Sequence, residues 1–432
     1  MIRRQSPIFS IENIEKDQRL EKIREKEHSW RCTHSKLIVM LLFLTIVLID
    51  FLVAAEMDIL VPSFPALQQQ FSLSPFMVQF VLSANGVFYA LSSLFMGPLG
   101  DRMGRKQVIL GGLFVFIAGC FLCFTATSYT MVIVGRILQG IGMSGSAVLV
   151  FVIVSDEYPK EKQATIFSSL NGVITLGMAL SPLIGSYVNL RFGWKGNIGF
   201  LFVLAIISLT FCTLFVPKRP LNIKKNVQFS LMSYAPLFKS KVFLRLALTV
   251  CLLDGCYWIF VGMSSILYVE DMGVPLDQFW YYQGAVAGAF ALSSLLNPLL
   301  FKYIPPKKCL VWSLYASLFF GFAMVIMGIF VKDTPLYISI SFCLFSAALV
   351  FPLNIAYPKA IALYPEFKGR AAAFINIGIL IFTAIGLQVV SFFYGGNFVY
   401  LALFMFVYIL ISFILMRSEF NNTKNNPKLM FF

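Results

Sequence analysis

Twelve long apolar runs constrain this chain of 432 residues more than any other feature of its sequence. A helix of about 20 mostly apolar residues crosses the hydrocarbon core of a bilayer, and each run has roughly that length or more. Because 12% of the residues are charged, against roughly 25% in soluble domains, we expect an all-α integral membrane protein with twelve transmembrane helices. The runs lie near residues 37–63, 76–98, 107–126, 129–154, 164–190, 197–216, 242–269, 277–301, 309–331, 334–357, 369–393 and 396–416.

A single long polar connection, residues 217–241, separates the first six runs from the last six. This division predicts two pseudo-symmetric six-helix bundles, over residues 36–216 and 242–416, with the polar segment as their linker. A charged tail, residues 1–35, precedes the first bundle, and a shorter tail, residues 417–432, follows the second.

Basic residues are distributed very unevenly along the chain. Of the 34 Lys and Arg residues, 29 fall in the tails and in the connections on one side of the expected bundles, and 3 fall on the other side. The positive-inside rule therefore predicts a multi-pass protein of the plasma membrane with both termini in the cytoplasm. The same asymmetry accounts for the net charge of +14, so the expected partner is the lipid bilayer and not a nucleic acid.

The cysteines give no sign of a metal or a cofactor. Most of the eight lie inside apolar runs, where a thiol behaves as a small hydrophobic group. Cys120 and Cys123 have the spacing of a metal-binding pair, but no second pair or nearby histidine completes a tetrahedral site. We therefore expect no metal and no cofactor.

Apart from Arg245, near the start of the seventh run, five charged residues lie inside the apolar runs: Asp50, Glu56 and Asp58 in the first, Arg136 in the fourth and Asp254 in the seventh. An ionisable group at the centre of a bilayer costs at least about 2.5–3.5 kcal/mol, so such groups normally face a polar cavity and have a partner. They are the leading candidates for functional residues. The alternative is a set of charges that only orients the helices.

Helix geometry predicts how these charges are arranged. Asp50 and Asp58 are eight residues apart, about 80° in azimuth and about 12 Å in rise, so both can line one broad face, whereas Glu56 lies about 160° from Asp58. Asp58 and Arg136 lie at similar depth in the outer half of the membrane, and we expect them to form an ion pair. Asp50 and Asp254 lie at matching depths in the two halves, as in a site at the interface between repeats.

Small residues form a stripe in the fifth run. Gly177, Ser181 and Gly185 follow one another at four-residue spacing, with Pro182 in the middle. This pattern predicts close helix packing and a kink. The stripe is either a gating element or ordinary packing.

The connection after the second run carries a recognisable motif. Its sequence, residues 97–106, resembles the cytoplasmic signature loop of the major facilitator superfamily. The residues Arg136 to Gly140 resemble the fourth-helix motif of the proton antiporters in that superfamily, and the stripe from Gly177 to Gly185 resembles their fifth-helix motif. The resemblance implies the twelve-helix fold and a gating role for the signature residues Gly97, Asp101, Arg102, Gly104 and Arg105, as well as for Gly177, Pro182 and Gly185.

Within the superfamily, the chain is most similar to the MdfA-type multidrug/proton antiporters, with the Bcr/CflA group related. The first run keeps the two acids of that group at the same spacing, with Asp50 in place of a glutamate, and Pro62 four residues after Asp58. The resemblance implies a bacterial inner-membrane protein in which Asp50 and Asp58 bind protons and cationic drugs and Arg136 is coupled to them. Glu56 and Asp254 depart from the family pattern.

These observations favour a proton-coupled exporter of lipophilic, cationic or zwitterionic small molecules, monomeric and working by alternating access. Tyr257, Trp258 and Phe260 are the expected aromatic lining of its substrate cavity, where aromatic faces attract cations. The open alternatives are an exporter or importer of a specific metabolite, such as a siderophore, an amino acid or a sugar-like compound. An enzyme is not expected, because no histidine lies inside a run to act as a base. Transport driven by ATP is not expected either, because the sequence contains no nucleotide-binding P-loop.

Overall fold

The computed structural model describes residues 36–218, 234–330, 334–364 and 368–425. The charged tail, most of the linker and the last residues of the chain lie outside these ranges. In the described part of the chain all regular elements are helical. They are α2 (Lys36–Asp58), the 3₁₀ turn η1 (Val61–Ser63), α3 (Phe64–Phe71), α4 (Pro75–Met103), α5 (Arg105–Phe124), α6 (Tyr129–Glu157), α7 (Lys160–Phe215), α8 (Ala235–Lys239), α9 (Lys241–Ser265), the π-helical turn η3 (Ile266–Asp271), α10 (Leu276–Tyr303), α11 (Pro306–Phe330), α12 (Pro335–Ala362), α13 (Lys368–Phe393) and α14 (Phe398–Asn425).

Eleven helices in the described part of the chain are long and apolar enough to cross a membrane. Helix α7 is more than twice as long as one crossing requires, and it contains a break at Gly193, whose φ of 66° and ψ of −176° are not helical. L-residues rarely adopt such a positive φ, so a glycine is needed at this point. The two arms of α7 supply the fifth and sixth crossings, and the twelve-helix prediction is confirmed.

Serine side chains begin several of the long helices. Ser74, Ser128 and Ser240 precede α4, α6 and α9, and each hydroxyl accepts a hydrogen bond from the backbone N–H three residues later, at 3.4, 3.4 and 3.2 Å. These bonds satisfy N–H groups that have no partner within the helix. The apolar runs therefore become helices whose starting points are encoded by local polar residues.

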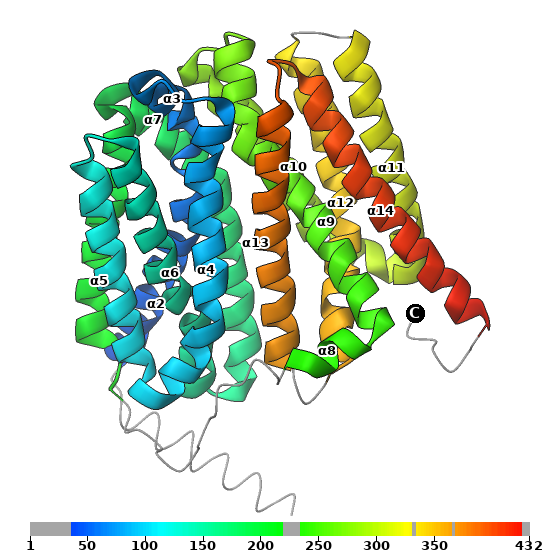
Figure 1. Ribbon diagram of the computed structural model, residues 1–432. Coiled ribbons are helices and arrows are strands. Elements are labelled where there is room, and N and C mark those ends of the chain that lie inside the picture. Colours follow the sequence, from blue (N-terminus) through cyan, green and yellow to red (C-terminus); the bar gives the residue numbers. More distant parts are fainter. Residues whose placement is uncertain (1–35, 219–233, 331–333, 365–367, 426–432) are drawn as a thin grey trace, which may run out of the picture.

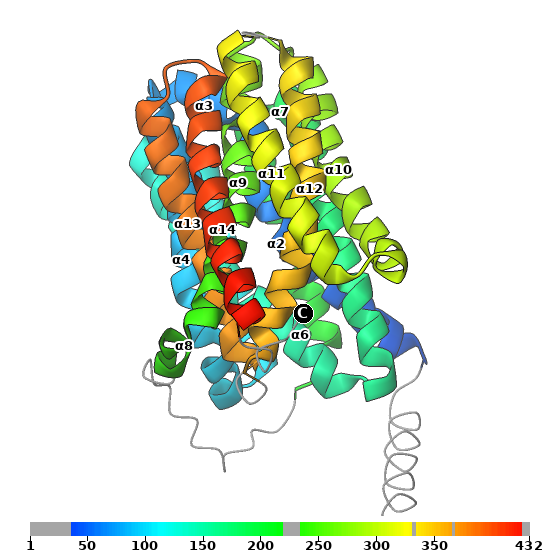
Figure 2. The ribbon, with the colours of Figure 1, turned by 90° about the vertical axis from the view of Figure 1, so that its right-hand side faces the viewer.

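The helices form two bundles, α2 to α7 and α9 to α14 (Figure 1). Helices α4 and α13 lie side by side between them, and α7 contacts α10 across the same interface. Figure 2 shows the second bundle from its outer side, with α11, α12 and α14 toward the viewer. We call the end at which α4, α6, α10 and α12 finish the basic end, because Arg102, Lys302 and Lys359 lie there.

One asparagine fixes the far end of α2 against α7. The side-chain amide of Asn197 donates to the carbonyl oxygen of Ile59 at 3.0 Å, to that of Gly185 at 3.0 Å and to the hydroxyl of Ser63 at 2.8 Å. Asn197 is completely buried. These three hydrogen bonds fix the segment that directly follows Asp58, and thereby fix the position of that acid.

Candidate functional site

A cavity of about 950 Å³ lies between the two bundles. Residues of α2, α4, α6 and α7 line it on one side, and residues of α9 and α13 line it on the other. At one end the lining includes Asp101 near the end of α4 and Arg370 near the start of α13, so the cavity extends to the basic end of the molecule.

Two acids of α2 line this cavity. Asp50 is 1% exposed and Asp58 is 3% exposed, and Oδ2 of Asp50 has no hydrogen-bond partner. The 12 Å rise expected between them places them at two depths in the same space. In the described part of the chain, no Lys or Arg side chain lies within 4 Å of either carboxyl group.

Arg136 pairs with Glu56, and the predicted ion pair between Arg136 and Asp58 is wrong. Nη1 of Arg136 lies 3.6 Å from Oε1 of Glu56 and donates to Oε1 of Gln139 at 2.6 Å. The side-chain amide of Asn85 donates both to Glu56 and to the carbonyl oxygen of Arg136. Arg136 and Glu56 are completely buried and neither lines the cavity.

The physical reason lies in the azimuth of the side chains on α2. Residue counting places Asp58 and Arg136 at one depth, but depth does not determine which face of a helix meets its neighbour. Glu56 points about 160° away from Asp58. The face that carries Glu56 meets α6, so Glu56 receives the guanidinium and Asp58 faces the cavity.

The second bundle contributes Asp254 of α9 to the cavity lining. Trp258, one turn further along α9, also lines the cavity, as does Thr383 of α13, whose hydroxyl is buried and has no hydrogen-bond partner. Asn376 of α13, another lining residue, accepts a hydrogen bond of 3.1 Å from the hydroxyl of Tyr357. This wall therefore combines one acid, one indole and neutral polar groups.

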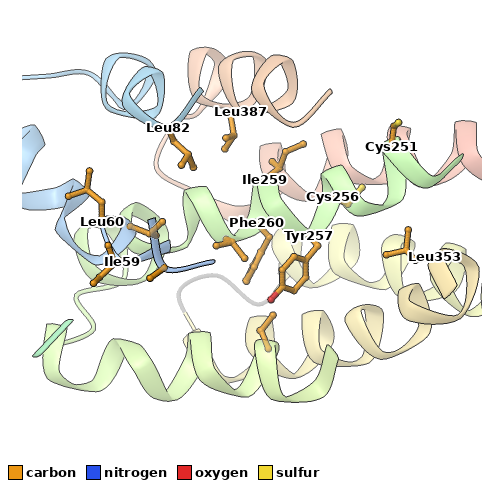
Figure 3. Packing of buried hydrophobic residues seen from close by; sticks show 14 of the residues in the cluster. Ile59, Leu60, Leu82, Cys251, Cys256, Tyr257, Ile259, Phe260, Leu353 and Leu387 are labelled. Carbon is orange, nitrogen blue, oxygen red and sulfur yellow. The ribbon is translucent and has the colours of Figure 1, made fainter. Parts of the chain in front are cut away.

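Two of the three expected cavity aromatics lie elsewhere, and the prediction is wrong for Tyr257 and Phe260. Both are buried, and neither lines the cavity. Phe260 stacks on Phe342 with ring centroids 3.6 Å apart, and Tyr257 packs against Phe290 at 5.0 Å. Figure 3 shows Tyr257 and Phe260 among the buried hydrophobic residues of this region. Tyr257 therefore packs into the second bundle, whereas Trp258, the next residue, lines the cavity.

The signature loop lies at the mouth of the cavity. Gly97 and Asp101 line the mouth, whereas Arg102 is exposed to its surroundings and does not. Arg105 forms ion pairs with Asp101 at 2.8 Å and with Asp156 of α6 at 3.1 Å.

A tight corner separates α4 from α5 within this loop. Its residue is Gly104, whose φ of 97° favours glycine. The corner returns the chain so that Arg105 faces both Asp101 and Asp156. The loop thereby connects α4 and α5 to the end of α6.

The small-residue stripe of α7 packs against α2. A side chain at Gly177 would collide with Ala54, and one at Gly185 would collide with the carbonyl oxygen of Ile59. The Ser181 hydroxyl donates to the carbonyl oxygen of Gly177 at 2.5 Å. Pro182 lies within the helix between these contacts. None of the four stripe residues lines the cavity, so the stripe positions the helix that carries the acids.

Hydrogen bonds between the bundles close the end opposite the basic end. Gln79 of α4 donates to the carbonyl oxygen of Gly262 of α9 at 2.8 Å, and Gln68 of α3 donates to Glu270 of η3 at 3.1 Å. Gln388 of α13 donates to the hydroxyl of Ser83 of α4 at 3.0 Å. Leu82 and Leu387 pack around Gly262 at the same level (Figure 3).

The sequence reasoning missed these closing residues. A signal was present, because Gln79 and Gln388 are uncharged polar residues inside apolar runs, and such residues seek hydrogen bonds across helix interfaces. They were not predicted because only charged residues inside the runs were taken as candidates. The structure is therefore open at the basic end and closed at the other.

Comparison with known proteins agrees with this architecture. Residues 46–386 match the profile of the family described as Major Facilitator Superfamily. The multidrug resistance protein MdtM of Salmonella typhimurium is 25% identical over 368 residues, which cover 82% of this chain and 87% of that protein. The multidrug resistance protein MdtL of Salmonella dublin is 27% identical over 262 residues, or 60% of this chain, and the match spans 66% of its length, just under two thirds.

Solved structures share the fold at low sequence identity. The xylose transporter XylE from E. coli, in a partially occluded inward open conformation, has a TM-score of 0.69 at 13% identity and covers 89% of this chain and 98% of its own. The nucleoside transporter NupG has a TM-score of 0.69 at 16% identity, with 87% and 99% covered. At these identities the likeness concerns the fold alone.

Proposed function

Since this chain belongs to the Major Facilitator Superfamily and is a transporter of small molecules, we propose that it exports lipophilic cations in exchange for protons. The observation that supports this proposal is the negative charge of the cavity. Asp50, Asp58 and Asp254 line the cavity. Arg136, which lies at a depth similar to that of Asp58, is paired with Glu56 and does not line the cavity.

The cavity is chemically suited to a cation. Among the described residues that line it, Arg370 at the mouth is the one basic side chain, and the acids deeper inside have no base within ion-pair distance. A carboxylate in such surroundings is stabilised by a proton or by a cationic ligand. The indole of Trp258 adds a face that attracts cations. Neutral and anionic molecules gain neither interaction.

Competition for these carboxyl groups supplies the coupling. A cation that binds to Asp50 or Asp58 displaces the proton held there, and by linkage a proton weakens the binding of the cation to the same extent. Tyr89 of α4 also lines the cavity, and the residues of α4 that line it include no Lys or Arg. The exchange of one ligand for the other follows from the shared site.

Alternating access requires the two ends of the cavity to open in turn. In the proposal, the basic end is cytoplasmic, as the distribution of Lys and Arg predicts, and the observed conformation is the one that receives substrate from the cytoplasm. The signature-loop residues and the α7 stripe, Gly177, Pro182 and Gly185, control the transition. The cavity is complete within one chain, which supports a monomer as the working unit.

Labelling of single cysteines tests the orientation. We expect a cysteine placed in the loop after α4 to resist a membrane-impermeant maleimide in intact cells and to react in inside-out vesicles. A cysteine placed between α5 and α6 should behave in the opposite way. Reaction of the first cysteine in intact cells would contradict the orientation.

Transport in inside-out vesicles tests the function. With an imposed proton gradient, tetraphenylphosphonium should be accumulated, and its addition should release protons from the lumen of vesicles that contain the wild-type chain. Vesicles with Asp50→Asn should do neither. Accumulation of sugars, amino acids or siderophores without any effect of the cation would replace the proposal with a metabolite carrier.

A further inference from the structure

Two carboxyl groups lie at the same depth on opposite walls of the cavity. Asp50 is the fifteenth residue of α2, and Asp254 is the fourteenth residue of α9. Both helices start at the basic end, so at 1.5 Å per residue each acid lies about 20 Å into the molecule. Both side chains line the cavity. The pseudo-symmetry of the two bundles thus places one acid on each wall.

The wall formed by the second bundle is built to receive a ligand. Thr383 is 9% exposed, its hydroxyl has no hydrogen-bond partner, and it lines the cavity next to Gly255, the neighbour of Asp254. Trp258 lines the cavity one helical turn from Asp254. A carboxylate, a free hydroxyl and an indole together match a flat cationic group with a polar edge.

The acid on the opposite wall likewise has no basic partner. Oδ2 of Asp50 is buried and unbonded, and no Lys or Arg in the described part of the chain lies within 4 Å of Asp50 or Asp254. Arg136 cannot serve either acid, because Glu56, Gln139 and the backbone bond with Asn85 hold it outside the cavity.

We infer that Asp254, Trp258 and Thr383 form a second cation subsite, which faces the subsite at Asp50, and that the cavity takes dications whose two charges are carried by separate groups. The inference rests on the proposed function and specifies its substrate class. A cavity of about 950 Å³ is at the upper end of the size of ligand pockets, roughly 300–1,000 Å³, and can hold an elongated molecule that reaches both walls.

Asp58 completes the arrangement. It lies eight residues beyond Asp50 on α2, toward the closed end, and lines the same cavity. A dication bound between Asp50 and Asp254 leaves Asp58 free to exchange a proton. A monocation needs one wall only, so loss of Asp254 affects the two classes of substrate differently.

A matched pair of probes tests the inference on the purified full-length chain. The dication is 1,1′-dimethyl-4,4′-bipyridinium, and the monocation is 1-methyl-4,4′-bipyridinium, which has the same ring system and one quaternary nitrogen fewer. In Asp254→Asn we expect the affinity for the dication to fall about tenfold or more and the affinity for the monocation to change less than about twofold. A tenfold change corresponds to about 1.4 kcal/mol.

Two variants serve as controls. Asp277→Asn removes an exposed acid of the same bundle outside the cavity and should leave both affinities unchanged. Asp254→Glu keeps the charge and should keep the dication affinity within about threefold of wild type. Retained binding of the monocation shows that Asp254→Asn is folded. If Asp254→Asn binds neither probe, the result for Asp254→Glu is used instead. Loss of dication affinity in Asp254→Glu, which keeps the charge, would overturn the subsite.

The remaining outcomes separate the two claims. Equal partial losses for both probes in Asp254→Asn, or no loss for either, would overturn the subsite while proton-coupled transport of the monocation still supports the proposed function. If the wild-type chain binds neither probe and releases no protons, the proposed function itself fails, and the subsite fails with it.

Discussion

The two bundles share a fold and differ sharply in where they hold charge. The first bundle holds three acids and one base that are at most 3% exposed, at Asp50, Glu56, Asp58 and Arg136. In the second bundle the cavity wall carries Asp254 alone among acids, and rings such as Phe260 and Phe342 fill the interior behind it. The two halves therefore share one helical framework, while the buried charged residues are concentrated in the first half.

The loops at the basic end repeat this contrast. The loop between α4 and α5 holds the ion pairs of Arg105 with Asp101 and Asp156. Its counterpart between α10 and α11 carries Lys302, Lys307 and Lys308 without an acid, and no ion pair joins its described residues to the rest of the described chain. Among the described residues, the first half therefore has a corner at the basic end that is held by ion pairs, and the second half has no such corner.

The largest expected effect concerns the buried pair of the first bundle. Arg136→Met leaves the Glu56 carboxyl buried without its cation, and removal of one member of a buried pair costs about 3–5 kcal/mol. We expect the free energy of unfolding in detergent to fall by that amount. The double variant Glu56→Gln/Arg136→Met should recover most of it.

The matched change in the second bundle is Asp254→Asn. Asp254 is half-buried and has no ion pair in the described structure, so its replacement should change the free energy of unfolding by less than about 1 kcal/mol. Equal destabilisation by Arg136→Met and Asp254→Asn would contradict the asymmetry between the bundles.

A smaller effect is expected at the contact between α7 and α2. Gly185→Leu forces a side chain into the carbonyl oxygen of Ile59 and should cost about 1–3 kcal/mol. The displaced α2 carries Asp58 with it, so transport should fall about tenfold or more. The measurement is the initial rate of cation accumulation, normalised to folded protein.

Gly288→Leu in α10 is the control for that change. A Cβ at Gly288 meets no atom within 4 Å, and the residue is exposed on the second bundle. Transport should stay within about twofold of wild type. Normal transport by Gly185→Leu would show that the small residues of α7 are not needed for transport.

The smallest expected effect is at the signature loop. Asp101→Asn removes a partly exposed ion pair, which is worth about 0–1 kcal/mol, so stability should hardly change. The loop between α4 and α5 loses the ion pair of Arg105 with Asp101, so the transition between the two conformations should slow and the transport rate should fall severalfold. Lys307→Gln in the loop of the second half should have no effect. Identical transport rates for Asp101→Asn and Lys307→Gln would contradict the inference that the two loops differ in function.

The sequence predicted the fold because a bilayer leaves few choices. A run of about 20 apolar residues has to satisfy its own backbone, and the helix is the structure that does so. The twelve crossings follow from this rule, and the division into two halves follows from the one long polar connection in the sequence, residues 217–241. The break at Gly193, with positive φ, shows where two crossings join with almost no loop.

The partners of the charged residues were harder to predict. Depth along a helix follows from counting, but the rotation of each helix depends on packing with its neighbours. This is why Asp50 and Asp254 could be matched by depth while Arg136 was assigned to Asp58 instead of Glu56. The same uncertainty in rotation led to the wrong placement of Tyr257 and Phe260, which point into the core.

In the proposed function, protons and cations compete for cavity acids that have no basic ion-pair partner. The measurement is the affinity of the purified chain for tetraphenylphosphonium between about pH 6 and 8.5, together with proton release in weakly buffered detergent. Wild type should bind more tightly as pH rises and release protons on binding, and Asp50→Asn or Asp58→Asn should lose part or all of both responses. An affinity independent of pH and the absence of proton release in the wild-type chain would contradict the claim.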